Sequence, residues 1–190
     1  MRKLVSLMHV SLDGFVAGPN GEMNWIKISE EIFDLAGDLT NQADTALYGR
    51  VTYDMMEAFW PTAADQPDPT KHIIEHSAWY LEVDKVVVST TIQSDRDAKR
   101  TVISDHLESG IKHLKEQDGK NILLLGSPRL TRTLIEADLI DETWLCINPV
   151  LLGQGIKMFP EMQSSKSLTF VSSEIRNPGV IAVHSRRNQP

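Results

Sequence analysis

Cysteine is nearly absent from this chain. Cys146 is the only one among 190 residues, which excludes an internal disulfide and favours a reducing compartment. Long hydrophobic runs are also missing, because no apolar stretch approaches the ~20 residues of a membrane span. The first residues lack both the apolar core and the cleavage site of a signal peptide. We therefore expect a cytoplasmic protein without a membrane partner.

A basic surplus is absent as well. The formal net charge is -7, which argues against a nucleic-acid partner and leaves room for a local basic pocket. Apolar residues make up 41% of the chain and charged residues 24%, the balance of an ordinary globular protein. At this length we expect a single domain over residues 1–190. No complete G-x-G-x-x-G fingerprint occurs, which disfavours a standard Rossmann dehydrogenase.

Short apolar runs alternate with helical patterns along the chain. Strands are expected at 4–10, 46–48, 85–89, 101–103, 121–125 and 142–148, and a hairpin at 168–173 and 180–184. Helices are expected after the N-cap Ser29 and at 51–59, 72–80, 107–117 and 130–137, with loops at 13–21 and 60–71. This order predicts an α/β fold: a mostly parallel central sheet with helices on both faces and an antiparallel C-terminal hairpin.

One strand-to-helix turn lies directly after the apolar strand 121–125. Glycine at its first position lets backbone N–H groups approach a diphosphate, and the helix amino terminus behind it attracts anions. Ser127 adds a hydroxyl, and proline suits the first helical turn. The candidate cofactor residues here are Gly126, Ser127, Pro128, Arg129 and Leu130. A plain strand-to-helix turn explains the same residues equally well.

A second turn is built in the same way, from Gly49, Arg50, Val51 and Thr52. The guanidinium of Arg50 could grip a phosphate, and Thr52 could donate a hydroxyl. Three more hydroxyls, from Ser89, Thr90 and Thr91, follow the strand 85–89. In open sheets ligands bind outside the carboxyl ends of the strands. Three turns suited to bind anions at this edge predict a site for a dinucleotide with an extra phosphate, which favours NADPH over NADH.

Several segments resemble dihydrofolate reductases. Residues 47–53 look like the strand, turn and helix that hold the ribose phosphate of the cofactor in that family. Residues 86–90 resemble the next strand and its phosphate-binding end, and residues 123–126 resemble the strand and glycine turn under the diphosphate. Residues 23–25 resemble the mobile loop that closes over the nicotinamide, which makes Trp25 a candidate lid residue or else plain core.

A closer resemblance is to the reductase domain of the bifunctional deaminase-reductase of riboflavin biosynthesis. Residues 10–14, 139–142 and 149–155 look like the first-strand signature, the late strand and the glycine loop of that group. The resemblance implies a homodimeric, NADPH-dependent oxidoreductase similar to 5-amino-6-(5-phosphoribosylamino)uracil reductase, acting on a small pyrimidine- or pterin-like substrate. Two features depart from the pattern: the glycine pair is missing after Gly126, and one cysteine cannot supply a zinc deaminase site.

Two acids are candidates for a catalytic role. Asp13 follows the first strand, where it could also be an ordinary Asp-Gly turn residue. Glu30 lies five residues after Trp25, the spacing of the substrate-gripping acid in dihydrofolate reductases, and could equally be a first-turn helix acid. Glu31 is its one-residue alternative. A true dihydrofolate reductase and a non-catalytic NADPH-binding protein of the same fold are the competing functions.

The string His72-Ile73-Ile74-Glu75-His76 matches the metallopeptidase pattern H-x-x-E-H. Two histidines four residues apart on a helix could share a zinc ion. A string this short arises easily by chance, and the resemblance places it away from the active cleft. We therefore expect no metal site.

Overall fold

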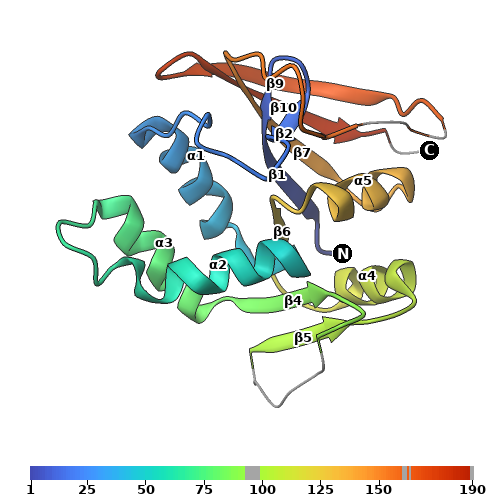
Figure 1. Ribbon diagram of the computed structural model, residues 1–190. Helices are drawn as coiled ribbons and strands as arrows, with labels where there is room; N and C mark the ends of the chain where they lie inside the picture. Colours follow the sequence, from blue (N-terminus) through green and yellow to red (C-terminus); the bar gives the residue numbers. More distant parts are fainter. Residues whose placement is uncertain (93–98, 160–161, 163, 189–190) are drawn as a thin grey trace.

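The computed structural model describes residues 1–92, 99–159, 162 and 164–188. Its main sheet has eight strands in the order β5-β4-β3-β6-β1-β7-β10-β9 (Figure 1). The strands of this sheet are β1 (Leu4–Ser11), β3 (Ala43–Gly49), β4 (Asp84–Val88), β5 (Arg100–Ile103), β6 (Asn121–Leu125), β7 (Glu142–Asn148), β9 (Leu168–Arg176) and β10 (Val180–Arg187).

The first six strands of that order, from β5 to β7, run parallel to one another. β10 and β9 complete the sheet as an antiparallel hairpin. The parallel strands are buried on both faces, as in the fully buried run Ile122 to Leu124 of β6. The predicted fold class is confirmed, including the C-terminal hairpin.

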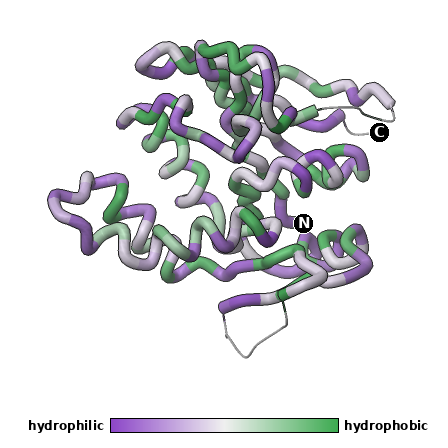
Figure 2. The backbone as a smooth tube through the Cα atoms, viewed as in Figure 1, coloured by the Kyte–Doolittle hydropathy of each residue, from purple (hydrophilic) through white to green (hydrophobic). Residues whose placement is uncertain are grey.

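Helices cover both faces of the parallel part of the sheet, as Figure 1 shows. The helices are α1 (Glu30–Asn41), α2 (Arg50–Ala63), α3 (Lys71–Glu82), α4 (Leu107–Glu116) and α5 (Pro128–Glu136). α1, α2 and α3 lie over the core that contains Leu7, Tyr48 and Leu125. α4 and α5 pack over the opposite core, which contains Leu47 and Leu124. In Figure 2 hydrophobic and hydrophilic residues alternate along the helices, as expected of helices with one apolar face.

The prediction of a loop over residues 60–71 is wrong at its start, because α2 continues to Ala63 with Pro61 inside its last turn. Packing outweighs the helix-breaking tendency of proline here. The ring of Trp60 lies 4.0 Å from the ring of His76 on α3, measured between centroids, and its indole N–H donates to the sulfur of Met56. A proline this close to a helix end disrupts little of the hydrogen-bond ladder.

The predicted glycine-rich loop 13–21 also contains a strand that the sequence pattern misses. β2 (Phe15–Ala17) pairs antiparallel with β8 (Ile156–Lys157) in a second, two-stranded sheet. Pairing over two or three residues leaves no periodic signal in the sequence. It fixes the loop after β1 against the late glycine loop, whose Gly155 approaches the backbone of Ala17 so closely that no side chain fits.

β9 is the edge strand of the main sheet and exposes large apolar side chains. Phe170 is 63% exposed and Ile175 78% exposed, far more than core residues of the same type. The predicted homodimer stays a prediction.

In the described parts of the chain, no helix is both long enough and apolar enough to cross a bilayer.

Candidate functional site

The turns singled out in the sequence meet at one edge of the sheet. β3 and β4 end in register at Gly49 and Val88, and β6, which pairs with β3, ends at Leu125. Because these strands are parallel, the segments that follow them emerge on the same side. The prediction that the Gly49, Ser89 and Gly126 turns gather at the carboxyl edge is therefore confirmed.

Two of these turns are locked together by hydrogen bonds. The N–H of Gly49 donates to the hydroxyl of Ser127 at 2.9 Å, and the N–H of Ser127 donates to the hydroxyl of Thr52 at 3.1 Å. The Ser127 hydroxyl also lies within 3.4 Å of the Leu125 carbonyl, to which it donates. Ser127 was expected to offer a hydroxyl to a ligand. In the structure this hydroxyl is buried and engaged within the turn, so the two turns form one unit.

Gly126 and Ser127 are both left-handed, with φ of 60° and 55°. This pair of conformations reverses the chain between β6 and α5. The N–H of Gly126 donates to the Leu7 carbonyl on β1 at 3.1 Å, which ties the turn to the neighbouring strand. A methyl group added at Gly126 would lie 3.3 Å from Thr52, so the glycine is needed for contact between the turns as well as for its conformation.

Both helices that start at this unit lack side-chain caps. The N-cap position of α2 is Gly49, which has no side chain, and that of α5 is Ser127, whose side chain makes no hydrogen bond to the first turn of the helix. By contrast, Ser29 caps α1 through the N–H of Ile32. First-turn N–H groups that no cap satisfies can bind phosphate oxygens, and the helix dipole adds attraction for the anion. The locked turns therefore present two uncapped helix amino termini beside one another.

The other predicted cofactor residues lie around this unit. The side chains of Arg50 and Val51 are 47% and 70% exposed, and Arg50 pairs with Asp54 at 2.7 Å. Arg129 is exposed, whereas Leu130 belongs to the core, so only its backbone faces the turn. Ser89 is buried, and its hydroxyl accepts hydrogen bonds from the N–H groups of Thr91 and Ile92. Thr90 and Thr91 are exposed beside it, and Pro128 is half-buried at the start of α5.

Asp13 serves as an anchor between two loops. Its carboxylate accepts hydrogen bonds from the Ser11 hydroxyl at 2.6 Å, the Gly153 N–H at 2.7 Å and the Leu152 N–H at 3.1 Å. The hydrogen bond from Ser11, together with those from the backbone, lowers the pKa of Asp13 to about 2. A carboxylate that stays ionised is a poor proton donor. These contacts favour a positioning role for Asp13 over the acid role considered from the sequence.

Replacing Asp13 with asparagine is expected to lower the melting temperature at neutral pH, because the amide accepts these hydrogen bonds less well. The native pKa is depressed, so the stabilisation is present above the unfolded value of 3.8 and is lost as pH falls through about 2. The difference from wild type should therefore shrink between pH 4 and pH 2 in circular-dichroism melts. Asp38→Asn on the exposed face of α1 is the control, and an equal effect there would contradict this reading.

The two candidate acids on α1, Glu30 and Glu31, make different contacts. The carboxylate of Glu31 accepts the N–H of Asn177 at 2.9 Å, and the Ser29 hydroxyl donates to the Asn177 carbonyl at 2.5 Å. These bonds fasten the amino end of α1 to the β9–β10 turn. Glu30 is exposed, and its side chain makes no hydrogen bond or ion pair to any described residue. Of these two neighbouring acids, only Glu30 has a carboxylate without a hydrogen bond to the described residues, which leaves it available for a ligand.

Trp25 lies half-buried in the loop between β2 and α1, and its indole N–H donates to the Glu22 carbonyl at 3.0 Å. The sequence analysis missed the residue that holds this loop. Asn148, fully buried at the carboxyl end of β7, accepts the N–H of Lys27 at 2.8 Å and donates to the Cys146 carbonyl at 3.1 Å. A buried asparagine at the end of an apolar strand is the signal that could have identified it.

The H-x-x-E-H string lies on α3, but its two histidines are engaged in ring packing. His72 stacks on Phe33 with centroids 5.5 Å apart, and His76 packs between Trp60 and Trp79. Within the described residues, no group of three histidine, cysteine or acidic side chains is placed to hold a metal ion.

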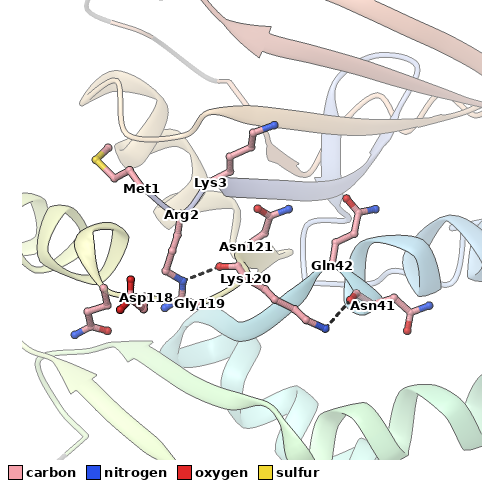
Figure 3. Close-up of a pocket in the computed structure, with 10 residues that line it drawn as sticks. Met1, Arg2, Lys3, Asn41, Gln42, Asp118, Gly119, Lys120 and Asn121 are labelled. Carbon is pink, nitrogen blue, oxygen red and sulfur yellow. Dashed lines mark hydrogen bonds between the residues drawn. The ribbon is translucent and has the colours of Figure 1, made fainter.

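A polar hollow of about 580 Å³ lies at the opposite, amino edge of the sheet (Figure 3). Two of its cationic side chains are already engaged within the protein. Arg2 donates to the Lys120 carbonyl and pairs with Asp44, and Lys120 donates to the Asn41 carbonyl at 3.2 Å. It is separated from the glycine turns by the length of the strands, so it is no part of the candidate site.

Comparison with known proteins finds similarity over nearly the whole chain. A family model described as the RibD C-terminal domain matches residues 2–182. The uncharacterized protein YyaP of Bacillus subtilis is 32% identical over 183 residues, covering 96% of this chain and 93% of that protein.

Solved structures share the fold at lower identity. A deaminase and 5-amino-6-(5-phosphoribosylamino)uracil reductase from Thermotoga maritima matches with a TM-score of 0.69 and 16% identity, over 98% of this chain and 57% of that one. The dihydrofolate reductase of Enterococcus faecalis, complexed with NADP(H) and RAB-propyl, matches with a TM-score of 0.61 and 16% identity, over 98% of this chain and 97% of that one. The family match over nearly the whole length shows that this chain belongs to the RibD C-terminal domain family.

Proposed function

We propose that the protein is an NADPH-dependent reductase that binds the cofactor across the locked turns of Gly49 and Gly126. The observation that carries this proposal is the pair of uncapped helix amino termini beside one another at the carboxyl edge. Their first-turn N–H groups suit the two phosphates of a diphosphate. When bound, NADPH supplies the hydride, and the protein binds, orients and shields the reactants.

The residues present fit this cofactor. The first-turn N–H groups of Arg129 and Leu130 would face one phosphate, and those of Val51 and Thr52 the other. Arg50, with Thr90 and Thr91, would contact the additional ribose phosphate that distinguishes NADPH from NADH. The substrate would be a planar heterocycle of the pyrimidine or pterin type, held beside β1 and α1 and shielded by the Trp25 loop.

Arg50→Gln is expected to weaken NADPH binding about 10- to 100-fold, the value of one or two charge-assisted hydrogen bonds. NADH binding should change little, because NADH lacks the phosphate that Arg50 would contact. Fluorescence titrations with both cofactors measure this difference. Asp54→Asn removes the ion-pair partner of Arg50 and should not weaken NADPH binding. Equal losses for both cofactors in Arg50→Gln would contradict the assignment.

A second candidate activity, dihydrofolate reduction, is favoured by the free carboxylate of Glu30 at the start of α1. Glu30→Gln removes a carboxylate that could hold the substrate ring and assist its protonation, and it keeps the size of the side chain. If dihydrofolate is the substrate, this variant should lose turnover at neutral pH while its affinity for NADPH is unchanged. An equally active variant would reject Glu30 as the acid.

A further inference from the structure

The side chains of His9 and Asn148 meet at the carboxyl ends of β1 and β7, next to the proposed cofactor turns. His9 pairs in register with Cys146, and Ser11 with Asn148. The backbone of Leu7, two residues before His9, accepts the Gly126 N–H. The side chain of Leu7 belongs to the core under α1. Because side chains alternate along a strand, His9 lies on the same face, between the end of β1 and α1.

The hydrogen bonds of Asn148 favour one neutral form of the His9 ring. The Lys27 N–H donates to the side-chain oxygen of Asn148, which identifies the other terminal atom as the amide nitrogen. That nitrogen donates to the Cys146 carbonyl at 3.1 Å, and its second hydrogen faces both Nδ1 of His9 at 3.4 Å and the Val10 carbonyl at 3.5 Å. An amide nitrogen cannot accept a hydrogen bond, so a hydrogen on Nδ1 would face another donor, and this favours Nδ1 as an acceptor. The favoured position of the ring hydrogen in neutral His9 is therefore Nε2.

The Nε2 atom of His9 is available to a ligand. It makes no hydrogen bond to the described residues, and it is not among the buried side-chain atoms that lack a partner. The side chain is half-buried, and burial lowers the pKa of His9 to about 4. At neutral pH the ring therefore presents one uncharged N–H donor at the carboxyl edge.

We propose that His9, oriented by Asn148, recognises the substrate by donating its Nε2–H to a carbonyl oxygen or ring nitrogen of a planar heterocycle. This inference rests on the proposed function and adds a specificity-determining residue to it. A neutral donor suits an uncharged acceptor such as the carbonyl of a uracil ring. A site built around such a donor rejects analogues that lack the acceptor, because the donor would then be buried without a partner.

The orientation of His9 can be tested independently of any activity. Protein labelled with ¹⁵N in its histidines gives long-range ¹H–¹⁵N correlations that distinguish the two neutral forms, and His9→Gln assigns the signals of His9. We expect the Nε2–H form at pH 7. In Asn148→Leu, which has no amide donor, both neutral forms should appear. An Nδ1–H form or a protonated ring at pH 7 in wild type would overturn the inference.

Substrate recognition is tested with two probes, dihydrofolate and 5-amino-6-(5-phosphoribosylamino)uracil, added to the complex with NADP⁺. We expect at least one probe to shift the Nε2 signal of His9. For that probe, His9→Leu should raise the Kd at least 10-fold, and His9→Gln, which keeps an N–H donor, should raise it less than 3-fold. His113→Leu, at an exposed histidine on α4, is the matched control and should leave the Kd unchanged.

The outcomes separate this inference from the proposed function. If wild type binds no NADPH, the proposed function fails. If NADPH binds but neither probe shifts Nε2, or if His9→Leu binds the probe as well as wild type, the role of His9 is overturned and the cofactor site stands. NADPH affinity should be the same in wild type and His9→Leu, because His9 lies beyond the phosphate-binding turns.

Discussion

Gly126→Val is expected to weaken NADPH binding by about 100-fold or more, the loss that corresponds to two charge-assisted hydrogen bonds to phosphate. Valine is β-branched and avoids the left-handed conformation that Gly126 adopts at φ 60°. Its Cβ alone would lie 3.3 Å from the methyl group of Thr52, and its two methyl groups need further space. The turn must shift, which displaces Ser127 and separates the two helix amino termini.

Gly153→Val is the matched control for this substitution. Gly153 is also left-handed, at φ 73°, but among the described residues, its two chain neighbours aside, no atom lies within 4 Å of the position of its added Cβ. Valine at position 153 must also adopt the unfavourable left-handed conformation, but it meets no clash and lies in a different loop. NADPH titration of both variants, with circular dichroism to verify folding, should show weakened binding in Gly126→Val alone. A folded Gly126→Val protein with wild-type affinity would contradict the assignment of the turn.

Lys115→Met is expected to lower the free energy of unfolding by about 1–3 kcal/mol, the cost of losing charge-assisted hydrogen bonds, because Asp141 keeps Arg187 as a second ion-pair partner at 3.3 Å. The Lys115 side chain is 3% exposed, and its ammonium group donates to Asp141 at 2.5 Å and to the Leu139 carbonyl at 3.1 Å. Asp141 also accepts the Leu4 N–H at 2.8 Å. The pair thus joins α4 to the start of β1 at the amino edge, far from the cofactor turns.

Lys112→Met, on the same helix, is the matched control. The Lys112 side chain is 61% exposed and lies 3.9 Å from Glu108, so its loss should cost less than about 0.5 kcal/mol. Urea unfolding of both variants measures the difference. Similar midpoints for the two variants would show that the buried pair contributes little net stability.

The sequence was sufficient to predict the elements that recur as local patterns. A buried apolar strand followed at once by glycine and then a helix identifies the turns at Gly49 and Gly126, because each step depends on neighbours in the chain. The parallel sheet follows from the alternation of strands and helices. The N-cap Ser29 is confirmed by its hydrogen bond to the Ile32 N–H, which is again a local interaction.

Contacts between distant segments could not be read in the same way. The hydroxyl of Ser127 is expected at a ligand from its place in the turn, yet Gly49, 78 residues away, donates to it in the structure. Asp13 likewise finds its partners 139 and 140 residues along the chain, at Leu152 and Gly153. Local propensity contains no information on such pairings, so the partners of these polar side chains become known only from the fold.

The most direct test of the cofactor site is calorimetric titration of wild-type protein and Gly126→Val with NADPH and NADH at moderate ionic strength. We predict saturable NADPH binding at one site per chain in wild type, weaker binding of NADH, and strongly weakened NADPH binding in the variant. The absence of saturable NADPH binding to folded wild-type protein at millimolar concentration would contradict the account.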